Sequence, residues 1–377
     1  MIIGNYTFDS KARVHMSDDL GATVRQIVEA LGGGRVGMLV DVNLSENEYV
    51  QRLVEALKSD VELKVETSPG SEPTTAMVDD YAERFAQGRF DSIVGIGGGS
   101  TLDLTKAVSV IAVKSGSVTE YHGTGKALLK AIPKILVPTT AGTGAEVTSG
   151  AVLVNKETGF KRGLGGDLVT ADHAVLFPRI TMSMPDSVAA STGMDALAHA
   201  IESYTCKEAN PITRMYSRQA FALIYPNLMK TLDDPEDLES RRALLLGSCL
   251  AGYAIYNSNT GACHAISYPL GIHHLVPHGI AIGMLIPEVM KINIEKGCNL
   301  YERLIDETHG DAAAVLDDLL NDFGPRKYLP KTMAEFGIKP KDVPELAERG
   351  MDLKPAIDAN PVVFTVDDAT RALASVT

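Results

Sequence analysis

Up to about Pro178 the chain alternates short apolar runs with longer stretches of helical periodicity, and beyond that residue only helical periodicity remains. A chain that repeats strand and helix in this way is typical of a parallel sheet with helices on both faces. The runs expected as strands are Val36–Asp41, Val61–Glu66, Ser92–Ile96 and Ile135–Val137. The helices expected between them include Glu46–Leu57, Thr74–Ala86 and Leu102–Val113. The first half of the chain is therefore predicted to be an α/β domain.

The second half shows helices without strands. Its periodic segments include Met194–Cys206, Ile212–Leu232, Arg241–Tyr256 and Ala312–Phe323. Because 377 residues exceed what one hydrophobic core usually organises, we predict an α/β domain over residues 1–182 and an all-helical domain over residues 183–377. Nothing between the halves resembles a flexible linker, so we expect the domains to pack closely and form a cleft.

The N-terminal segment is expected to be extended before the first helix. Ile2–Phe8 and Ala12–His15 read as two extended pieces around Asp9–Lys11, which indicates a β-hairpin. A helix is expected over Leu20–Leu31, and the glycines Gly32–Gly34 that follow would end it.

Charge and cysteine content exclude several classes of partner. The net charge of −13 and the pI of about 5.2 argue against nucleic-acid binding, which needs a basic face. Four cysteines without CxxC spacing do not indicate a disulfide framework, so a reducing compartment fits. The start of the chain has no basic segment followed by an apolar one, and no run of 18 apolar residues occurs. We therefore expect a cytoplasmic protein that neither spans a membrane nor is exported.

A glycine-rich turn follows the predicted strand Ser92–Ile96. The glycines Gly97–Gly99 lead into a helical pattern that opens with Ser100 and Thr101. Glycines let the backbone approach a pyrophosphate closely, and the start of a helix offers unpaired N–H groups to an anion. The turn therefore predicts a phosphate site, with a tight turn that needs glycine only for its conformation as the alternative.

A second polar turn, Pro138–Glu146, leaves the predicted strand Ile135–Val137 and contains Thr139 and Thr140. Two such turns at the ends of parallel strands can line one crevice, where sheets of this type bind ligands. Asp41 ends another strand, where an acidic residue could hold ribose hydroxyls and repel a 2′-phosphate. An ordinary turn or N-cap aspartate is the alternative for that residue.

Acidic and histidine side chains in the second half suit a metal ion. Asp195 and His199 are four residues apart and share one face of a predicted helix, while His264 and His278 lie on separate elements. A carboxylate with three imidazoles suits Fe²⁺ or Zn²⁺ and leaves a position for a substrate oxygen. On spacing alone, His278 has two competitors, His273 and His274.

Five motifs occur in order between about Gly37 and Pro287. They are Gly97–Ser100 with Asp103 and Lys106, Pro138–Glu146, Gly193–Asp195 with His199 and Glu202, Gly261–His264, and Pro277–Gly279. In this order they closely resemble the motifs of the iron-containing, or group III, alcohol dehydrogenase family. The match is specific because it extends over most of the chain.

The resemblance implies a first domain that binds NAD or NADP, a helical second domain, a divalent metal ion in the cleft between them, and a homodimer. The metal ligands carried over by position are Asp195, His199, His264 and His278. Together with Asp41, the predicted cofactor-binding residues are Gly98, Gly99, Ser100, Thr101, Asp103, Thr139, Thr140, Thr148 and Lys161.

The implied reaction is hydride transfer between a nicotinamide and the carbon of an alcohol or aldehyde held at the metal. Water, Tyr268, His273 and His274 are alternative routes for the alcohol proton, with Tyr268 and His274 taken as the catalytic candidates. Tyr253, Tyr256, Asn257 and His274 are expected near the substrate. This polar set favours a polyhydroxylated or sugar-acid primary alcohol.

The chain departs from the family pattern at three places. Tyr268 stands where many members have a second histidine, a tyrosine shared with sugar-acid oxidoreductases of the family. Glu72–Thr74 replaces the usual Asn-Pro-Thr, and Asn360–Val362 replaces the usual Asn-Pro-Arg.

Two other functions are compatible with this architecture. A dehydroquinate-synthase-like lyase would bind NAD with a ligand set of one glutamate and two histidines, whereas this chain offers one aspartate and three aligned histidines. A non-catalytic nucleotide-binding homologue should have lost metal ligands, and none is missing from the motifs.

Overall fold

The computed structural model describes residues 5–114, 116–121, 130–157 and 160–377. The chain divides into two compact units. The α/β unit comprises Ser10–Thr140 and Gly144–Ser183, and the helical unit comprises Met1–Asp9, Ala141–Thr143 and Met184–Thr377. The domain boundary between residues 182 and 183 stays a prediction.

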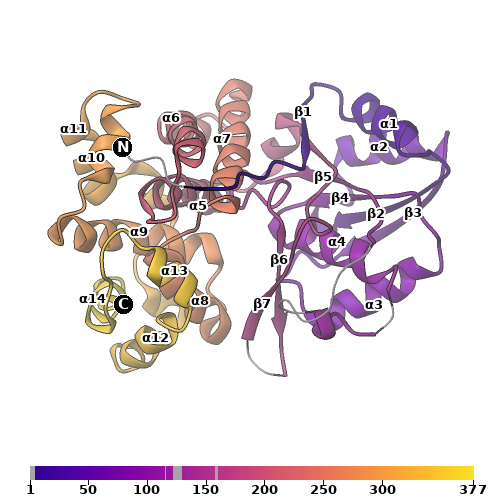
Figure 1. Cartoon of the computed structure of the whole chain (residues 1–377). Coiled ribbons are helices and arrows are strands. Elements are labelled where there is room, and N and C mark those ends of the chain that lie inside the picture. Colours follow the sequence, from indigo (N-terminus) through magenta and orange to yellow (C-terminus); the bar gives the residue numbers. More distant parts are fainter. Residues whose placement is uncertain (1–4, 115, 122–129, 158–159) are drawn as a thin grey trace. The chain divides into compact units, whose positions relative to one another are not determined.

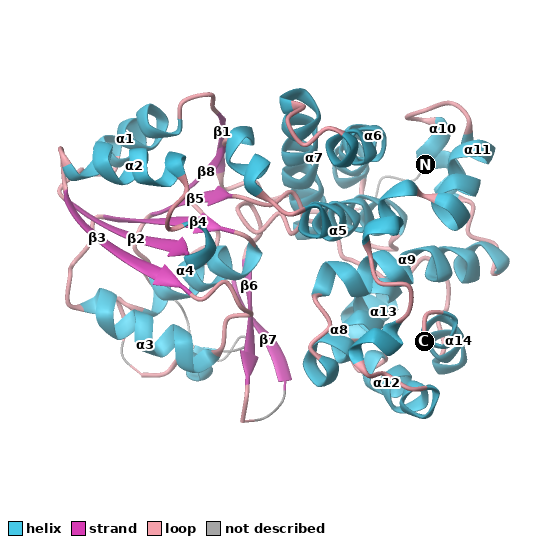
Figure 2. Ribbon diagram, turned by 180° about the vertical axis from the view of Figure 1, so that it is seen from behind, coloured by secondary structure: helices cyan, strands magenta, loops and turns pink. Residues whose placement is uncertain are grey.

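The sheet of the α/β unit contains six parallel strands in the order β1-β8-β5-β4-β2-β3 (Figure 1; β8 is labelled in Figure 2). Its strands are β1 (Arg13–Met16), β2 (Arg35–Asp41), β3 (Glu62–Ser68), β4 (Ser92–Gly97), β5 (Lys134–Pro138) and β8 (His173–Leu176). The four strands predicted from apolar runs are all present, so the α/β class is confirmed. β4 and β5 are buried along their whole length, as expected for parallel strands covered on both faces.

Helices cover both faces of this sheet. They are α1 (Leu20–Ala30), α2 (Glu48–Lys58), α3 (Thr75–Ala86) and α4 (Gly99–Ile111). Successive residues of β2 point to opposite faces, so Met38 packs in the core with α1 and α2 while Leu39 packs in the core with α3 and α4. Figure 2 shows α1 and α2 together on one side of the sheet and α3 on the other.

The prediction of an N-terminal hairpin is wrong. Residues 5–10 form no strand, and Ile2–Gly4 lie outside the described residues. β1 instead pairs in parallel with β8, with Arg13 opposite His173. The edge of the sheet supplies β1 with a partner far along the sequence, which a local pattern cannot indicate. The antiparallel pair that does form is β6 (Gly150–Asn155) with β7 (Phe160–Gly165).

The helical unit contains ten α-helices among its described residues, and the expected helical class is confirmed. They are α5 (Asp186–Thr205), α6 (Pro211–Asp233), α7 (Leu238–Tyr256), α8 (Ala262–His274), α9 (His278–Glu295), α10 (Leu300–Asp306), α11 (Ala312–Asp317), α12 (Val343–Gly350), α13 (Lys354–Ala359) and α14 (Val366–Ser375). The segment predicted as one helix over Ala312–Phe323 ends its α-helical part at Asp317 and continues as a π-helical turn, Asp318–Asp322. Helix α5 is buried from Ala189 onwards on nearly every side. A helix enclosed in this way carries its polar side chains into the interior.

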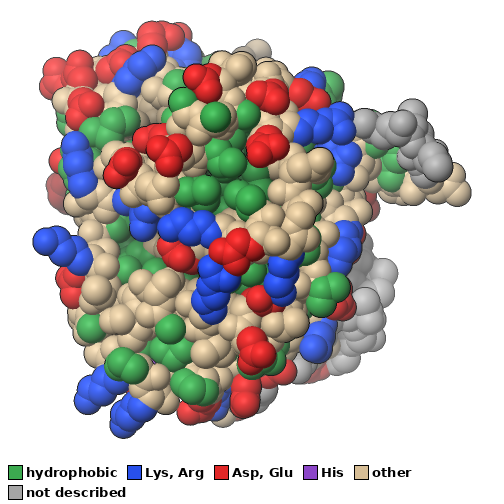
Figure 3. All heavy atoms as spheres, turned by 90° about the vertical axis from the view of Figure 1, so that its left-hand side faces the viewer, with side chains coloured by type: hydrophobic (Ala, Val, Ile, Leu, Met, Phe, Trp, Pro, Cys, Tyr) green, Lys and Arg blue, Asp and Glu red, His purple; other side chains and the backbone are tan. Residues whose placement is uncertain are grey.

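Acidic and basic side chains are interspersed on the face drawn in Figure 3, and no continuous basic stripe crosses it. Among the described residues, every helix is too short or too polar to cross a bilayer.

Candidate metal centre and nucleotide-binding turns

Three helices bring four potential metal ligands together in the helical unit. Asp195 and His199 lie one turn apart on α5, His264 lies in the first turn of α8, and His278 begins α9. The Nε2 atoms of His264 and His278 each lie 3.5 Å from Oδ1 of Asp195. Nε2 of His199 lies 3.9 Å from the same oxygen. All three imidazoles therefore approach the same oxygen of Asp195, and the ligand atoms of Asp195, His199 and His264 also lie within 4.8 Å of one another.

The donor atoms of this cluster fit a bound cation. Oδ1 of Asp195 and Nε2 of His264 are both buried, and neither makes a hydrogen bond with the described part of the chain. Buried polar atoms without partners are costly, so such a pair indicates a group that completes them. A tetrahedral ion with ligand bonds of about 2.1 Å sets its ligands about 3.4 Å apart, close to the distances observed. The cluster therefore suits a zinc- or iron-sized divalent ion.

A second set of hydrogen bonds orients the histidines. Nδ1 of His264 is hydrogen-bonded to Glu202, whose other carboxylate oxygen accepts the backbone N–H of Cys263 at 2.9 Å. Nδ1 of His199 lies 3.3 Å from the carbonyl oxygen of Gly142. A carboxylate or carbonyl on the far nitrogen fixes the tautomer and leaves Nε2 as the ligand atom.

The charges of the cluster stabilise one another. Burial alone would raise the pKa of the Asp195 carboxyl, but His199, His278 and His264 outweigh that effect and hold its pKa well below the usual range. Burial lowers the pKa of His199, so that imidazole is neutral at pH 7. Burial likewise disfavours the charged form of His264, yet Glu202 and Asp195 raise its pKa to about 9. A cation at this point therefore competes with a proton on His264.

The two catalytic candidates occupy different places. Tyr268 lies one turn after His264 on α8, and its ring meets that of His278 edge-on with centroids 5.8 Å apart. His274 is the last residue of α8, ten residues past His264 and therefore about a quarter turn from it around the helix. Within the described chain, no hydrogen bond or ring contact links His274 to the cluster.

The glycine-rich turn has the predicted form. β4 ends at Gly97, Gly98 caps α4, and the first helical residues are Gly99, Ser100 and Thr101. A Cβ on Gly97 would lie 2.6 Å from Cβ of Thr101, so only glycine permits this tight entry into the helix. The start of α4 therefore presents N–H groups along an open backbone.

The other turn lies beside the first. The backbone N–H of Thr139, at the end of β5, donates to the carbonyl of Gly97 at 3.0 Å. The Thr140 side chain would touch a Cβ on Gly98 at 3.4 Å. Both predicted turns therefore meet at the carboxyl edge of the sheet.

Asp41 lies at the same edge, one strand away. Its carboxylate accepts the backbone N–H of Asn43 at 3.0 Å and caps the short 3₁₀ turn Val42–Leu44. Oγ1 of Thr101 lies 3.4 Å from its other oxygen and 2.6 Å from Oγ of Ser68. Asp41 is thus an N-cap, as the alternative interpretation of this residue had it. It is also a neighbour of the glycine-rich turn.

Three predicted cofactor residues already have partners in the protein. Asp103 accepts the backbone N–H of Val152 at 2.9 Å and forms an ion pair with buried Lys106 at 2.8 Å. Oγ1 of Thr148 also lies 3.3 Å from Nζ of Lys106. Lys161, on β7, pairs with Glu72, the residue that replaces the usual asparagine. Asp103 and Thr148 therefore support the loop that follows the second turn.

Asn257, expected near the substrate, holds the N-terminal segment instead. Its Oδ1 accepts a hydrogen bond from the backbone N–H of Asp9 at 2.5 Å, and its Nδ2 donates one to the backbone carbonyl of Asp9 at 2.9 Å.

Two supporting residues were not predicted as site residues, although the family motifs include both. Glu202 follows Asp195 and His199 at spacings that keep all three on one face of α5, and this spacing was the available signal. Lys106 donates to the carbonyls of Ala145, at 2.9 Å, and Gly150. Its complete burial could not be read from a lysine in a helical pattern.

A parallel sheet with a glycine-rich turn, together with a helical unit that holds a buried Asp-His cluster, fits the plan expected of a metal-dependent dehydrogenase. The profile of the iron-containing alcohol dehydrogenases matches residues 12–178, and the profile of the C-terminal part of the Fe-containing alcohol dehydrogenase family matches residues 189–377. The chain belongs to the iron-containing alcohol dehydrogenase family.

Individual relatives agree with this assignment. Sulfoacetaldehyde reductase of Bilophila wadsworthia (strain 3_1_6) is 31% identical over 379 residues, which cover 93% of this chain and 97% of that protein. The structure of a 1,3-propanediol oxidoreductase matches with a TM-score of 0.90 at 26% identity, covering 99% of this chain and 100% of that one. The structure of sulfoacetaldehyde reductase from Bifidobacterium kashiwanohense in complex with NAD⁺ matches with a TM-score of 0.89 at 28% identity, covering 99% of each chain. The chain is therefore an oxidoreductase acting on alcohols or aldehydes.

Proposed function

We propose that Asp195, His199, His264 and His278 together hold one catalytic divalent metal ion in this dehydrogenase. The observation that carries the proposal is the convergence of three imidazole Nε2 atoms on Oδ1 of Asp195, at 3.5 to 3.9 Å. The unpaired buried atoms of Asp195 and His264 support it further. Iron is the preferred occupant because of the family, and zinc suits the same donors.

The protein's own residues prepare the reaction. When bound, the metal supplies Lewis acidity at the substrate oxygen and the nicotinamide exchanges hydride with the substrate carbon. Glu202 keeps the His264 ring oriented, and the carbonyl of Gly142 does the same for His199. The Tyr268 ring packs against the His278 ring in an edge-to-face contact. The chain thus contributes a fixed set of ligands rather than a strong base.

For the cofactor, we propose that the pyrophosphate lies on Gly98, Gly99, Ser100 and Thr101, with Thr139 and Thr140 beside it. Asp41 is 3.4 Å from Thr101, so a ribose next to the pyrophosphate would lie near its carboxylate. Like-charge repulsion there disfavours a 2′-phosphate, so NAD is preferred to NADP. Tighter binding of NADPH than of NADH in a fluorescence titration would contradict this preference.

We propose a small polar or anionic primary alcohol, or its aldehyde, as the substrate. The similarity to two sulfoacetaldehyde reductases supports an anionic substrate, and Tyr268 supports a sugar acid. The experiment is a screen of the iron- or zinc-loaded protein with sulfoacetaldehyde, sugar acids, aliphatic alcohols and aldehydes, using both NAD(H) and NADP(H). Faster turnover of long aliphatic alcohols than of every polar compound would overturn the substrate class while leaving the reaction class intact.

We also propose that the protein works as a homodimer in the cytoplasm. The acidic pI and four buried cysteines that form no disulfide fit a reducing compartment. Light scattering of the metal-loaded protein tests the dimer, which has about twice the chain mass of 40.2 kDa.

A further inference from the structure

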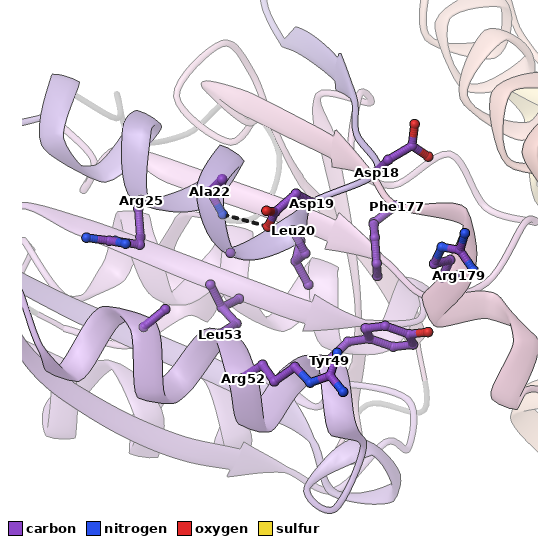
Figure 4. A pocket seen from close by; sticks show the side chains of 12 residues that line it. Asp18, Asp19, Leu20, Ala22, Arg25, Tyr49, Arg52, Leu53, Phe177 and Arg179 are labelled. Atoms are coloured by element: carbon purple, nitrogen blue, oxygen red, sulfur yellow. Dashed lines mark hydrogen bonds between the residues drawn. The ribbon is translucent and has the colours of Figure 1, made fainter.

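A pocket of about 650 Å³ opens in the α/β unit between α1 and α2 (Figure 4). It lies beside the carboxyl end of β8, where Phe177 and Arg179 follow the strand. None of its lining residues belongs to the glycine-rich turn or to the second polar turn. The pocket is therefore distinct from both predicted nucleotide-binding turns.

The floor of this pocket is apolar and partly aromatic. Leu20, Leu53 and Phe177 are buried side chains that reach it from α1, α2 and the end of β8. The Tyr49 ring meets the Phe177 ring at 74° with centroids 5.1 Å apart and forms one wall. A flat apolar group can pack against this surface.

Arginines surround the apolar floor, and they differ in their partners. Arg25 pairs with Asp60, and Arg52 pairs with Glu48 at 2.8 Å while lying over the Tyr49 ring. Arg179 is exposed and makes no hydrogen bond or ion pair within the described chain. An arginine without a partner beside an apolar surface is suited to a carboxylate or phosphate.

Two acidic residues also line the pocket. One Asp19 oxygen accepts the backbone N–H of Ala22 at 2.9 Å, so this carboxylate serves as the N-cap of α1. Asp18 is exposed, and it too interacts with another group of the protein. Because Arg25 and Arg52 are paired with Asp60 and Glu48, Arg179 is the lining arginine that is left for an anion.

We infer that this pocket binds a small organic anion with a flat apolar body, of the aryl phosphate or aryl carboxylate class. The ring lies against the partly exposed Tyr49 ring, above buried Leu53 and Phe177, and the anionic group is held by Arg179. The inference does not depend on the proposed function, because no residue of the metal cluster or of the two turns takes part.

Equilibrium dialysis of 4-nitrophenyl phosphate against the metal-loaded protein saturated with NAD⁺ tests the inference. Saturation with NAD⁺ occupies the nucleotide site, so any further binding must lie elsewhere. One molecule per chain is expected, with half-saturation below about 1 mM. Arg179→Gln is expected to weaken binding at least tenfold and Arg179→Lys by less than about threefold. The control is Arg13→Gln, which removes an exposed arginine outside the pocket lining and should bind as the unaltered protein does.

Tyr49→Trp locates the bound molecule, because the chain contains no tryptophan. The nitrophenyl group should quench this tryptophan saturably, at the concentration found by dialysis, whereas Tyr328→Trp in the helical unit should show only collisional quenching. The neutral analogue 4-nitroanisole should bind at least tenfold more weakly. Absence of binding at millimolar concentration, equal binding by Arg179→Gln and Arg13→Gln, or binding without quenching at residue 49 would each overturn the inference.

Discussion

The helical unit and the α/β unit build their sites from different parts of the polypeptide. In the helical unit, three histidine side chains from three helices approach one oxygen of Asp195. In the α/β unit, the turn at Gly97–Thr101 offers mainly backbone N–H groups, and the nearby charged side chains are used within the protein. The first site therefore depends on the identity of each side chain, whereas the second depends on the position of a loop.

This difference determines how each site should fail. Removing a ligand side chain should abolish the metal site and leave the fold, because the three helices that carry the ligands still pack together. Removing a buried charge behind the nucleotide turns disturbs the fold first, because an unpaired buried partner remains.

The largest effect is expected for Asp195→Asn, which keeps the shape of the side chain and removes its charge. Metal retention should be lost and turnover should fall by at least a thousandfold, or about 4 kcal/mol at the transition state. Metal analysis, turnover and circular dichroism measure the three quantities. Asp186→Asn, an exposed position on the same helix, is the control and should retain its metal. Full metal occupancy in Asp195→Asn would end the assignment of the cluster.

Lys106→Met tests the opposite behaviour in the α/β unit. The substitution leaves Asp103 and the carbonyls of Ala145 and Gly150 without their buried partner, so we expect a loss of about 3–5 kcal/mol in unfolding free energy. The KM for NAD should rise while metal content stays normal. Urea unfolding measures the loss, with exposed Lys58→Met as the control. A change below about 1 kcal/mol would show that Lys106 does not support the loop.

Glu146→Gln tests the same loop through the pH dependence of the unfolding free energy. Burial raises the pKa of Glu146 to about 7, with Lys106 opposing, from an ordinary value of 4.5. Because the pKa of Glu146 is higher in the folded than in the unfolded chain, its protonated carboxyl favours the folded state. This contribution to the unfolding free energy is fully present below pH 4.5 and is lost as the pH rises through 7. The variant should match the natural protein near pH 4.5 and exceed its unfolding free energy by up to about 3 kcal/mol at pH 8.5. Urea unfolding at both pH values decides it, and a difference independent of pH would refute the explanation.

Glu202→Gln sharpens the account of the metal site. Glutamine can still accept the N–H of Cys263, but it holds the His264 ring less strongly than a carboxylate does. Loss of such an orienting partner typically lowers metal affinity 10- to 100-fold. Competition with a chelator measures the affinity. Affinity equal to that of the natural protein would show that Glu202 has only a structural role.

The smallest effect is expected for Tyr268→Phe. A phenol with a pKa near 10 is a poor proton carrier at neutral pH, and Tyr268 lies edge-on against His278, as a packing residue would. Turnover should fall about tenfold or less, or about 1.4 kcal/mol. A thousandfold fall with metal and cofactor still bound would place the hydroxyl in the proton path.

The local parts of the fold were predictable from the sequence. β2 and β4 are apolar runs because parallel strands are covered on both faces, and each begins and ends within one residue of the prediction. The pairing of β1 with β8 was not predictable, since Arg13 and His173 are joined only by the sheet. The same limit explains the incorrect hairpin.

The candidate site divides in the same way. Asp195 and His199 were visible as neighbours on a helix face, but their approach to His278 depends on how α5 and α9 pack. The ion pair between Lys106 and Asp103 could not be predicted from the sequence either, because lysine is usually exposed and Lys106 is fully buried.

Alcohol oxidation by this chain should require one divalent ion held by the Asp195 cluster. Metal-free protein should be titrated anaerobically with Fe²⁺ while NADH formation from a screened alcohol is recorded. Activity should rise linearly to one ion per chain and then stop, and Asp195→Asn should stay inactive at every ratio. Full activity in the metal-free protein, or restoration of Asp195→Asn by the same single equivalent, would contradict the account.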